Sequence, residues 1–258
     1  MMVLLLISTA LAVEPVIEDV GAGQLNWTTM QLEISARSDR TVGAWKNVRV
    51  QEQDALDRLE PLIEDAARKV RFDPKRRAND LLNVEAGGVP ASVLRRLDDG
   101  LKSWRVRETR YLSNGGVEMD GVLEVHRWLR PMLLSQTEAT RNRGSADGPT
   151  GILVDARHLN FRPCLAPEVV TQDGKLLIHP SKVHPDVMRR RTPVVYVQDP
   201  ADPAAAARAG AHPNFLTAEA VQADCQLTLD TADSKRLADS TVFADSVTEA
   251  RVVIVVTP

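Results

Sequence analysis

Apolar and polar residues alternate from Leu25 to Arg37, and this two-residue period is typical of a half-buried β-strand. The period changes between Gln51 and Arg71, where apolar residues recur every three or four positions, as on one face of a helix: Leu56, Leu59, Ile63, Ala66 and Val70. Pro61 lies inside this stretch and lacks the N–H that would bond to the carbonyl of Asp57. We therefore expect a kink at Pro61, or a break into two short helices.

A second helix and a hairpin are expected next along the chain. The helix follows Pro90, a residue favoured in a first helical turn, and its apolar stripe is Leu94, Leu97, Leu101 and Trp104. A strand near Val106 leads to Asn114–Gly115, a pair that tolerates the positive φ of a tight hairpin turn. Beyond this turn, apolar residues alternate with polar ones as far as Leu129, which predicts a returning strand. One sheet face covered by helices predicts an α+β domain over residues 23–134.

Residues 137–149 contain no large apolar side chain, which predicts a linker or a long loop. Beyond it we expect a second, smaller α/β unit over residues 150–258 that is rich in short strands. Its expected elements are strands at 151–157, 194–197 and 252–256, a hairpin at 169–178 that turns at Asp173–Gly174, and short helices at 202–209 and 231–239.

Composition and the N-terminus indicate where the protein is found. The 258 residues have a net charge of −3 and a pI of about 6.0, which excludes the basic footprint of a general nucleic-acid binder. Residues 1–12 are uncharged, and Ala10-Leu11-Ala12 fits a signal-peptidase site. We therefore predict a signal peptide and an exported protein, with a buried N-terminal strand or helix as the alternative. No apolar run reaches the roughly 20 residues that span a bilayer.

The chain has two cysteines, Cys164 and Cys225. In an oxidising compartment they could form one disulfide that closes a loop of about 60 residues. Two separate buried thiols are an equal alternative.

Few residue clusters point to chemistry. His179, His184 and Asp186 resemble a metal cluster in composition, but their spacing suits no known ligand geometry, and a solvated Pro-rich loop is favoured. The motifs of serine hydrolases, phosphoryl-transfer enzymes and dinucleotide-binding enzymes do not occur. We therefore predict no enzyme, no catalytic residue, no metal and no cofactor.

Two clusters allow alternative interpretations. Asp155 and Arg157 are two positions apart on a predicted strand, so their side chains project from one face, where they can pair and orient the turn that follows. The catalytic alternative makes Asp155 a general base with His158 as its partner. The run Arg189–Arg191 could contact an anionic glycan, a lipid head group or an acidic partner, and the alternative is a solvated loop.

The chain resembles bacterial envelope proteins with a lipoprotein-twenty-type domain, a family related to the N-terminal part of flagellar assembly protein T. Thr150–Arg157, Pro163–Pro167 and Asp173–Gly174 are similar to its most specific motif, while Gly23–Trp27 and the helix from Gln51 resemble its N-terminal part. The resemblance implies structural motif positions at Gly151, Asp155, Ala156, Arg157 and Pro167. Where the family often has glycine, this chain has His158 and Asn160, and it has no lipobox cysteine.

The resemblance implies a non-enzymatic protein of the periplasm or outer envelope, a scaffold or accessory factor of an envelope protein assembly. A flagellar role is implied only through a relative. The alternative is a periplasmic binding module for cell-wall glycan or another anionic envelope polymer, which the run Arg189–Arg191 favours. A hydrolase that uses Asp155 and His158 ranks third. We expect an envelope protein partner, no nucleic acid and no membrane span.

Overall fold

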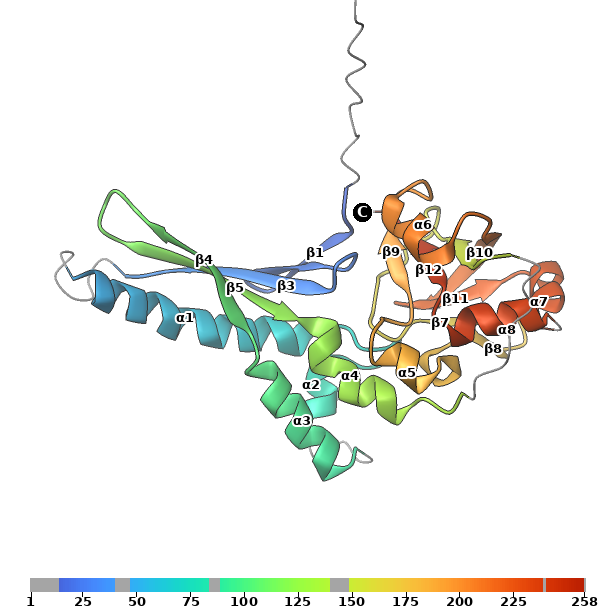
Figure 1. The fold of residues 1–258 in the computed structure, drawn as a ribbon, viewed down its shortest axis with the longest axis horizontal. Coiled ribbons are helices and arrows are strands. Elements are labelled where there is room, and N and C mark those ends of the chain that lie inside the picture. The colour runs from blue at the N-terminus through green and yellow to red at the C-terminus, as the bar shows by residue number, and fades with distance from the viewer. Residues whose placement is uncertain (1–13, 40–46, 84–88, 140–148, 239, 258) are drawn as a thin grey trace, which may run out of the picture.

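Two β-sheets, each with helices packed against it, form the part of the chain described by the computed structural model (Figure 1). The described residues are 14–39, 47–83, 89–139, 149–238 and 240–257. This architecture confirms the predicted α+β class, an antiparallel sheet with helices followed by a mixed sheet of short strands. The predicted signal peptide and most of the predicted linker lie outside the described residues.

The first sheet is antiparallel, with strand order β1-β2-β3-β5-β4. Its strands are β1 (Ile17–Val20), β2 (Gly23–Asn26), β3 (Gln31–Arg37), β4 (Arg105–Tyr111) and β5 (Val117–Glu124). Helix α1 (Val48–Lys69) packs along one face (Figure 1). A Cβ at Gly121 of β5 would lie 2.6 Å from Ile63 Cδ1 and 3.1 Å from Leu59 Cδ2, so glycine is what lets α1 approach the sheet.

The single strand predicted over 25–37 is wrong, because the chain turns between β2 and β3. The Asn26 side chain accepts hydrogen bonds from the amides of Thr28 and Thr29, each 3.0 Å long, and this local pairing favours a turn. Met30 completes the turn with a φ of 59°. The alternation of apolar residues breaks at the turn, where Thr28 and Thr29 are consecutive polar residues, so the sequence does carry a signal of it.

The predicted break at Pro61 is also wrong, since α1 is one helix of 22 residues. Pro61 and Asp57 both lie on its exposed side, where water can hydrate the carbonyl that loses its partner. Asn47 caps the helix by accepting a hydrogen bond from the amide of Val50.

Three shorter helices complete the first unit: α2 (Ala78–Leu82), α3 (Ala91–Leu101) and α4 (Val125–Ser135). The predicted helix after Pro90 is α3, with Pro90 as its N-cap. The strand predicted as far as Leu129 is wrong beyond Glu124, where α4 begins. The buried residues of α4 recur at helical spacing: Val125, Trp128, Leu129, Met132 and Leu133.

The second sheet has seven strands in the order β8-β7-β11-β10-β6-β12-β9. Its strands are β6 (Ile152–Asp155), β7 (Glu168–Val170), β8 (Leu176–Ile178), β9 (Val195–Val197), β10 (Asn214–Ala223), β11 (Gln226–Leu229) and β12 (Val252–Val255). β10, β6, β12 and β9 are parallel, whereas β10–β11 and β7–β8 are antiparallel pairs. The β7–β8 hairpin turns at the predicted Asp173–Gly174, where Gly174 has a φ of 81°.

The connections between the strands of the second sheet contain short helices. They are α5 (Pro185–Met188), α6 (Pro203–Ala209), α7 (Thr231–Ala238) and α8 (Thr241–Thr248), with a 3₁₀ turn at Pro180–Lys182. A small core between α6 and the sheet buries Leu153 and Val255, while Val154 and Ile254 face the main core. Burial on both faces explains the unbroken apolar runs of β6 and β12. None of the described helices has the length and apolar content needed to cross a membrane.

The two units share a hydrophobic core and several hydrogen bonds. Arg71, after α1, donates through Nε to the carbonyl of Pro163 (2.9 Å) and pairs with Glu18. The amide of Ala166 donates to the carbonyl of Phe72 (2.6 Å). This junction sets the position of helix α4 relative to the segment between α5 and β9 (Figure 1).

Candidate functional site

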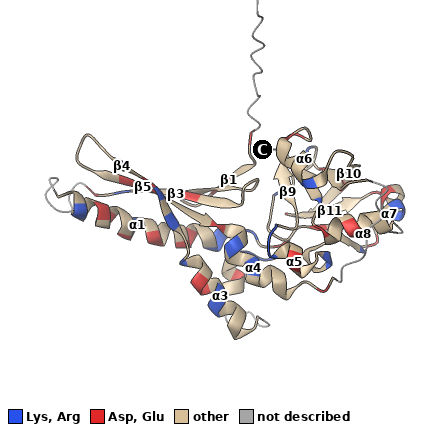
Figure 2. Ribbon diagram, in the orientation of Figure 1, with Lys and Arg blue, Asp and Glu red and all other residues tan. Residues whose placement is uncertain are grey.

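A basic cleft lies where the two units meet, and it consists of two adjoining cavities that share Arg190 and Arg191. The first cavity, of about 360 Å³, is bounded by the β2–β3 turn, the start of α4, the segment before β9 and α6. The second, of about 460 Å³, adds Arg251 at the start of β12. Basic residues therefore gather between elements that are far apart in sequence (Figure 2).

The arginines of the cleft have no acidic partner among the described residues: Arg127, Arg190, Arg191, Arg208 and Arg251. Two carboxylates also line it. Glu124 pairs with Arg105 at 3.4 Å, and Glu249 lies in the second cavity. The first cavity thus gathers four guanidinium groups in a protein whose net charge is −3.

Arg208 of α6 is held by neutral oxygens. Its Nη1 donates to the carbonyls of Thr192 (2.8 Å) and Ala250 (3.0 Å), and its Nη2 donates to the Thr192 hydroxyl (3.2 Å). Burial, together with the nearby Arg191, lowers the pKa of Arg208 to about 10. The side chain stays charged at neutral pH, and its positive charge is not neutralised by the groups that fix it.

Two buried nitrogen atoms of the cleft make no hydrogen bond within the described structure. They are His126 Nε2, in the first turn of α4, and Arg251 Nε. Burial lowers the pKa of His126 to about 4, with a further contribution from Arg130 and from Arg208. The imidazole is therefore neutral at pH 7. A buried polar nitrogen without a hydrogen-bond partner is costly, and a bound ligand that pairs with it removes that cost.

The backbone is strained at the same place. Met30 and Ala250 are the two non-glycine residues with positive φ in the described parts of the chain, at 59° and 52°. Met30 lines the first cavity, and the carbonyl of Ala250 binds Arg208. Met30 lies in the turn between β2 and β3, and Ala250 ends helix α8 with its amide bonded to the carbonyl of Val247, so a local turn explains each angle.

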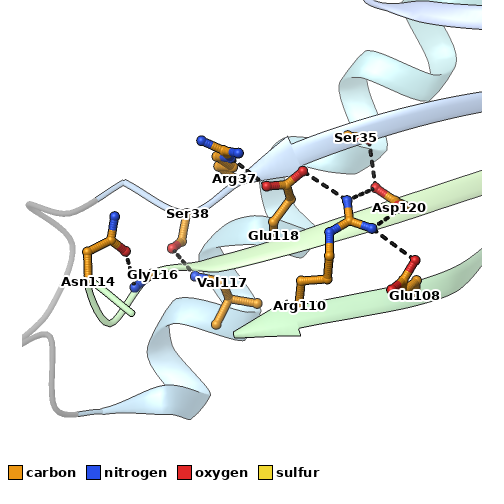
Figure 3. A network of polar contacts seen from close by, with 10 residues as sticks. All are labelled: Ser35, Arg37, Ser38, Glu108, Arg110, Asn114, Gly116, Val117, Glu118 and Asp120. Atoms are coloured by element: carbon orange, nitrogen blue, oxygen red, sulfur yellow. Dashed lines mark hydrogen bonds and ion pairs between the residues drawn. The ribbon is translucent and has the colours of Figure 1, made fainter. Parts of the chain in front are cut away.

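The outer face of the first sheet presents a second polar surface, a ladder of ion pairs centred on Arg110 (Figure 3). Arg110 contacts Glu118 at 2.9 Å and Asp120 at 2.6 Å, and Ser35 also donates to Asp120. The hydrogen bonds from Arg110 hold the pKa values of Glu118 and Asp120 below their usual range. These charges are neutralised within the sheet, unlike those of the basic cleft.

The structure brings Asp155 and Arg157 together, but not on one strand. β6 ends at Asp155, and Arg157 folds back across the turn so that its Nη2 lies 2.6 Å from Asp155 Oδ2. The hydrogen bond from Arg157 lowers the pKa of Asp155. His158 is exposed and makes no hydrogen bond to Asp155. Asp155 therefore orients the turn rather than a histidine base.

The other motif positions lie in packed structure. A Cβ at Gly151 would lie 2.5 Å from the carbonyl oxygen of Ala209, so a side chain there would displace α6. Ala156 and Pro167 are buried. Cys164 and Cys225 form a disulfide that ties the segment after β6 to the turn before β11.

The predicted histidine cluster has a local structural role. His179 Nδ1 accepts a hydrogen bond from the amide of Ser181, and His184 Nδ1 accepts one from the amide of Asp186. Each histidine is the N-cap of a short helical turn that begins with the proline after it. No group of three metal-ligating side chains occurs in the described ranges.

Of the predicted basic run, Arg190 and Arg191 line the cleft, whereas Arg189 pairs with Asp186. Sequence reasoning missed the other cleft residues, His126, Arg127, Arg208 and Arg251. Each is an isolated polar residue in an ordinary amphipathic element, and no local pattern links them.

The second unit has a known relative. Residues 151–258 match the family described as Treponema pallidum Tp0624, second domain. No curated protein matches the chain. The matched residues contain the whole second sheet. They also contain four of the cleft arginines, Arg190, Arg191, Arg208 and Arg251. His126 and Arg127 lie outside it, so the first unit completes the cleft.

Proposed function

We propose that the protein is a non-enzymatic, exported scaffold or accessory protein of a bacterial cell-envelope assembly. The observation on which this rests is the edge strand β4. Its seven residues are exposed or half-buried, and within the described structure only β5 pairs with it. An open edge of this length is a site where a strand of a partner protein can add to the sheet.

The backbone groups free for such pairing follow from the hairpin register. The amide of Leu112 donates to the carbonyl of Gly116, so the pair before it, Tyr111 and Val117, is of the non-bonded type. By the same alternation, Thr109 turns its amide away from β5. Thr109 and Tyr111 therefore offer their backbone groups to a partner strand.

Three further observations support the proposal. A disulfide between Cys164 and Cys225 suits an oxidising compartment. The resemblance to envelope proteins of the lipoprotein-twenty type, and through them to flagellar assembly protein T, implies an accessory role in an envelope assembly. The pairing of Asp155 with Arg157 supports the structural interpretation of this motif over the hydrolase hypothesis.

The test combines cell fractionation with crosslinking and a matched pair of edge variants. Thr109→Pro removes the outward amide, whereas Thr109→Val keeps it and preserves strand propensity. We expect recovery from the periplasm or envelope with one assembly, loss of that assembly in Thr109→Pro, and its retention in Thr109→Val, with both variants folded by circular dichroism. Recovery as a free cytoplasmic monomer, or equal capture by both variants, would contradict the proposal.

A further inference from the structure

We propose that the basic cleft binds an anionic chain carrying phosphate groups, with one phosphate in each cavity on either side of Arg190 and Arg191. This inference concerns a different surface from the β4 edge and does not depend on the scaffold function.

The excess of arginines over carboxylates in the cleft favours an anionic ligand. Arg127, Arg190, Arg191 and Arg208 converge on one cavity without a described carboxylate partner for any of them. Like charges held this close repel one another, and a bound anion removes the repulsion. The ladder around Arg110 differs, because there each arginine lies against carboxylates of the same sheet.

The number and geometry of the donors favour phosphate. A carboxylate has two oxygens in one plane and is satisfied by one guanidinium fork, whereas a phosphate presents more oxygens, in a tetrahedral arrangement, and can take several forks at once. His126 Nε2 and Arg251 Nε are buried nitrogens without a hydrogen-bond partner, one beside each cavity. The neutral imidazole of His126 can donate without adding charge.

Two cavities that share a wall favour a chain over a single ion. Arg190 and Arg191 line both cavities, so a ligand with repeated phosphates can occupy both at once. The site is concave and formed between two units, and Met30, Val187 and Val195 are the large apolar residues among those that line it. A membrane-binding surface needs exposed apolar side chains, so a free chain fits better than a bilayer.

The test measures binding of inorganic polyphosphate to the whole chain by isothermal titration calorimetry, at two salt concentrations. Arg190→Gln/Arg191→Gln is the cleft variant, because both side chains are exposed and their loss leaves the core intact. Arg95→Gln/Arg96→Gln is the matched control, an exposed consecutive pair on α3 with the same change in net charge. We expect the cleft variant to lose affinity by at least about tenfold and the control to stay within about twofold.

A third variant, Arg251→Gln, and three further ligands, inorganic phosphate, lipid vesicles and a carboxylate polymer, distinguish a phosphate chain from other anions. Arg251→Gln should weaken polyphosphate binding while leaving inorganic phosphate bound in the cavity that Arg251 does not line. Vesicles of phosphatidylglycerol and the carboxylate polymer polygalacturonate should bind less tightly than polyphosphate.

Four results would overturn the inference. The first is an absence of polyphosphate binding, and the second is an equal loss of affinity in the cleft and control variants, which would indicate diffuse electrostatic attraction. The third is tighter binding of the vesicles than of polyphosphate, and the fourth is binding of polygalacturonate as tight as that of polyphosphate. The β4 variant Thr109→Pro should bind polyphosphate like wild type, so failure of the scaffold proposal and failure of this one can be told apart.

Discussion

The hydroxyl of Tyr196 donates a 2.7 Å hydrogen bond to the carbonyl of Cys164, and the hydroxyl oxygen accepts one of 3.3 Å from the amide of Cys164. Tyr196 is fully buried on β9, and burial raises its pKa. Its ring meets Trp27 of the first unit edge-on, with the ring centres 6.0 Å apart. One side chain therefore joins the disulfide, the second sheet and the junction between the units.

Tyr196→Phe should lower the free energy of unfolding by about 1–2 kcal/mol, because it leaves the amide and carbonyl of Cys164 buried without this partner. Urea unfolding measures the change. The control is Tyr111→Phe, since Tyr111 is 63% exposed and its bond to Glu52 lies at the surface. That variant should stay within about 0.5 kcal/mol of wild type. Equal effects of the two substitutions would contradict the role assigned to Tyr196.

Reduction of the Cys164–Cys225 disulfide should destabilise the protein by about 4 kcal/mol. The two cysteines are 61 residues apart, and opening a loop of this size returns conformational entropy to the unfolded chain. The measurement is urea unfolding with and without dithiothreitol. The variant Cys164→Ala/Cys225→Ala should show the lower stability and no response to dithiothreitol. A wild-type protein that is indifferent to the reductant would refute the prediction.

Asp120→Asn should lower the free energy of unfolding by about 1 kcal/mol at neutral pH. The value is modest because Arg110 is 38% exposed and water screens the pair. Arg110 lowers the pKa of Asp120 from its ordinary 3.8, so the contribution is complete above about pH 3.8 and is lost as the pH falls through the lower folded-state pKa. The two stability curves should therefore converge in acid. Asp98→Asn, in an exposed pair with Lys102, is the control and should show little change.

The turns were predictable because their chemistry is local. Asn114–Gly115 and Asp173–Gly174 mark the two hairpins, and both glycines have positive φ, at 85° and 81°. The strand predicted over 25–37 was right over 31–37 and wrong before it, where Thr28 and Thr29 interrupt the alternation and the Asn26 side chain favours a turn. The strand predicted as far as Leu129 failed because its apolar positions fit a helical period as well as a strand period, and packing against α3 decides between them.

The basic cleft was predictable only at Arg190 and Arg191, which are consecutive. Arg127, Arg208 and Arg251 are separated by more than 40 residues from one another. The fold of the second unit brings Arg208 next to Ala250 and Arg251, and the docking of the two units, through contacts such as that between Arg71 and Pro163, adds Arg127. No periodicity or motif in the chain contains this information.

The stability of the protein should fall as the pH drops from 6.5 to 4 because of His126. Burial lowers its pKa from 6.5 to about 4, and Arg130 and Arg208 oppose its protonation, while the backbone at Met188 and Arg191 favours it. Between pH 6.5 and 4, His126 binds a proton in the unfolded chain but stays neutral in the folded protein. Stability is therefore complete above pH 6.5 and decreases by up to about 3 kcal/mol by pH 4.

The variant His126→Gln should flatten this part of the pH profile, which urea unfolding at half-unit pH steps measures. His212→Gln, at an exposed histidine, is the matched control and should keep the wild-type slope. A slope that survives in His126→Gln would show that other groups cause it and would remove His126 from the account. A slope lost in both variants would point to a general effect of histidine content. Loss in His126→Gln alone would establish a neutral imidazole between guanidinium groups, the state in which it can donate to a bound phosphate.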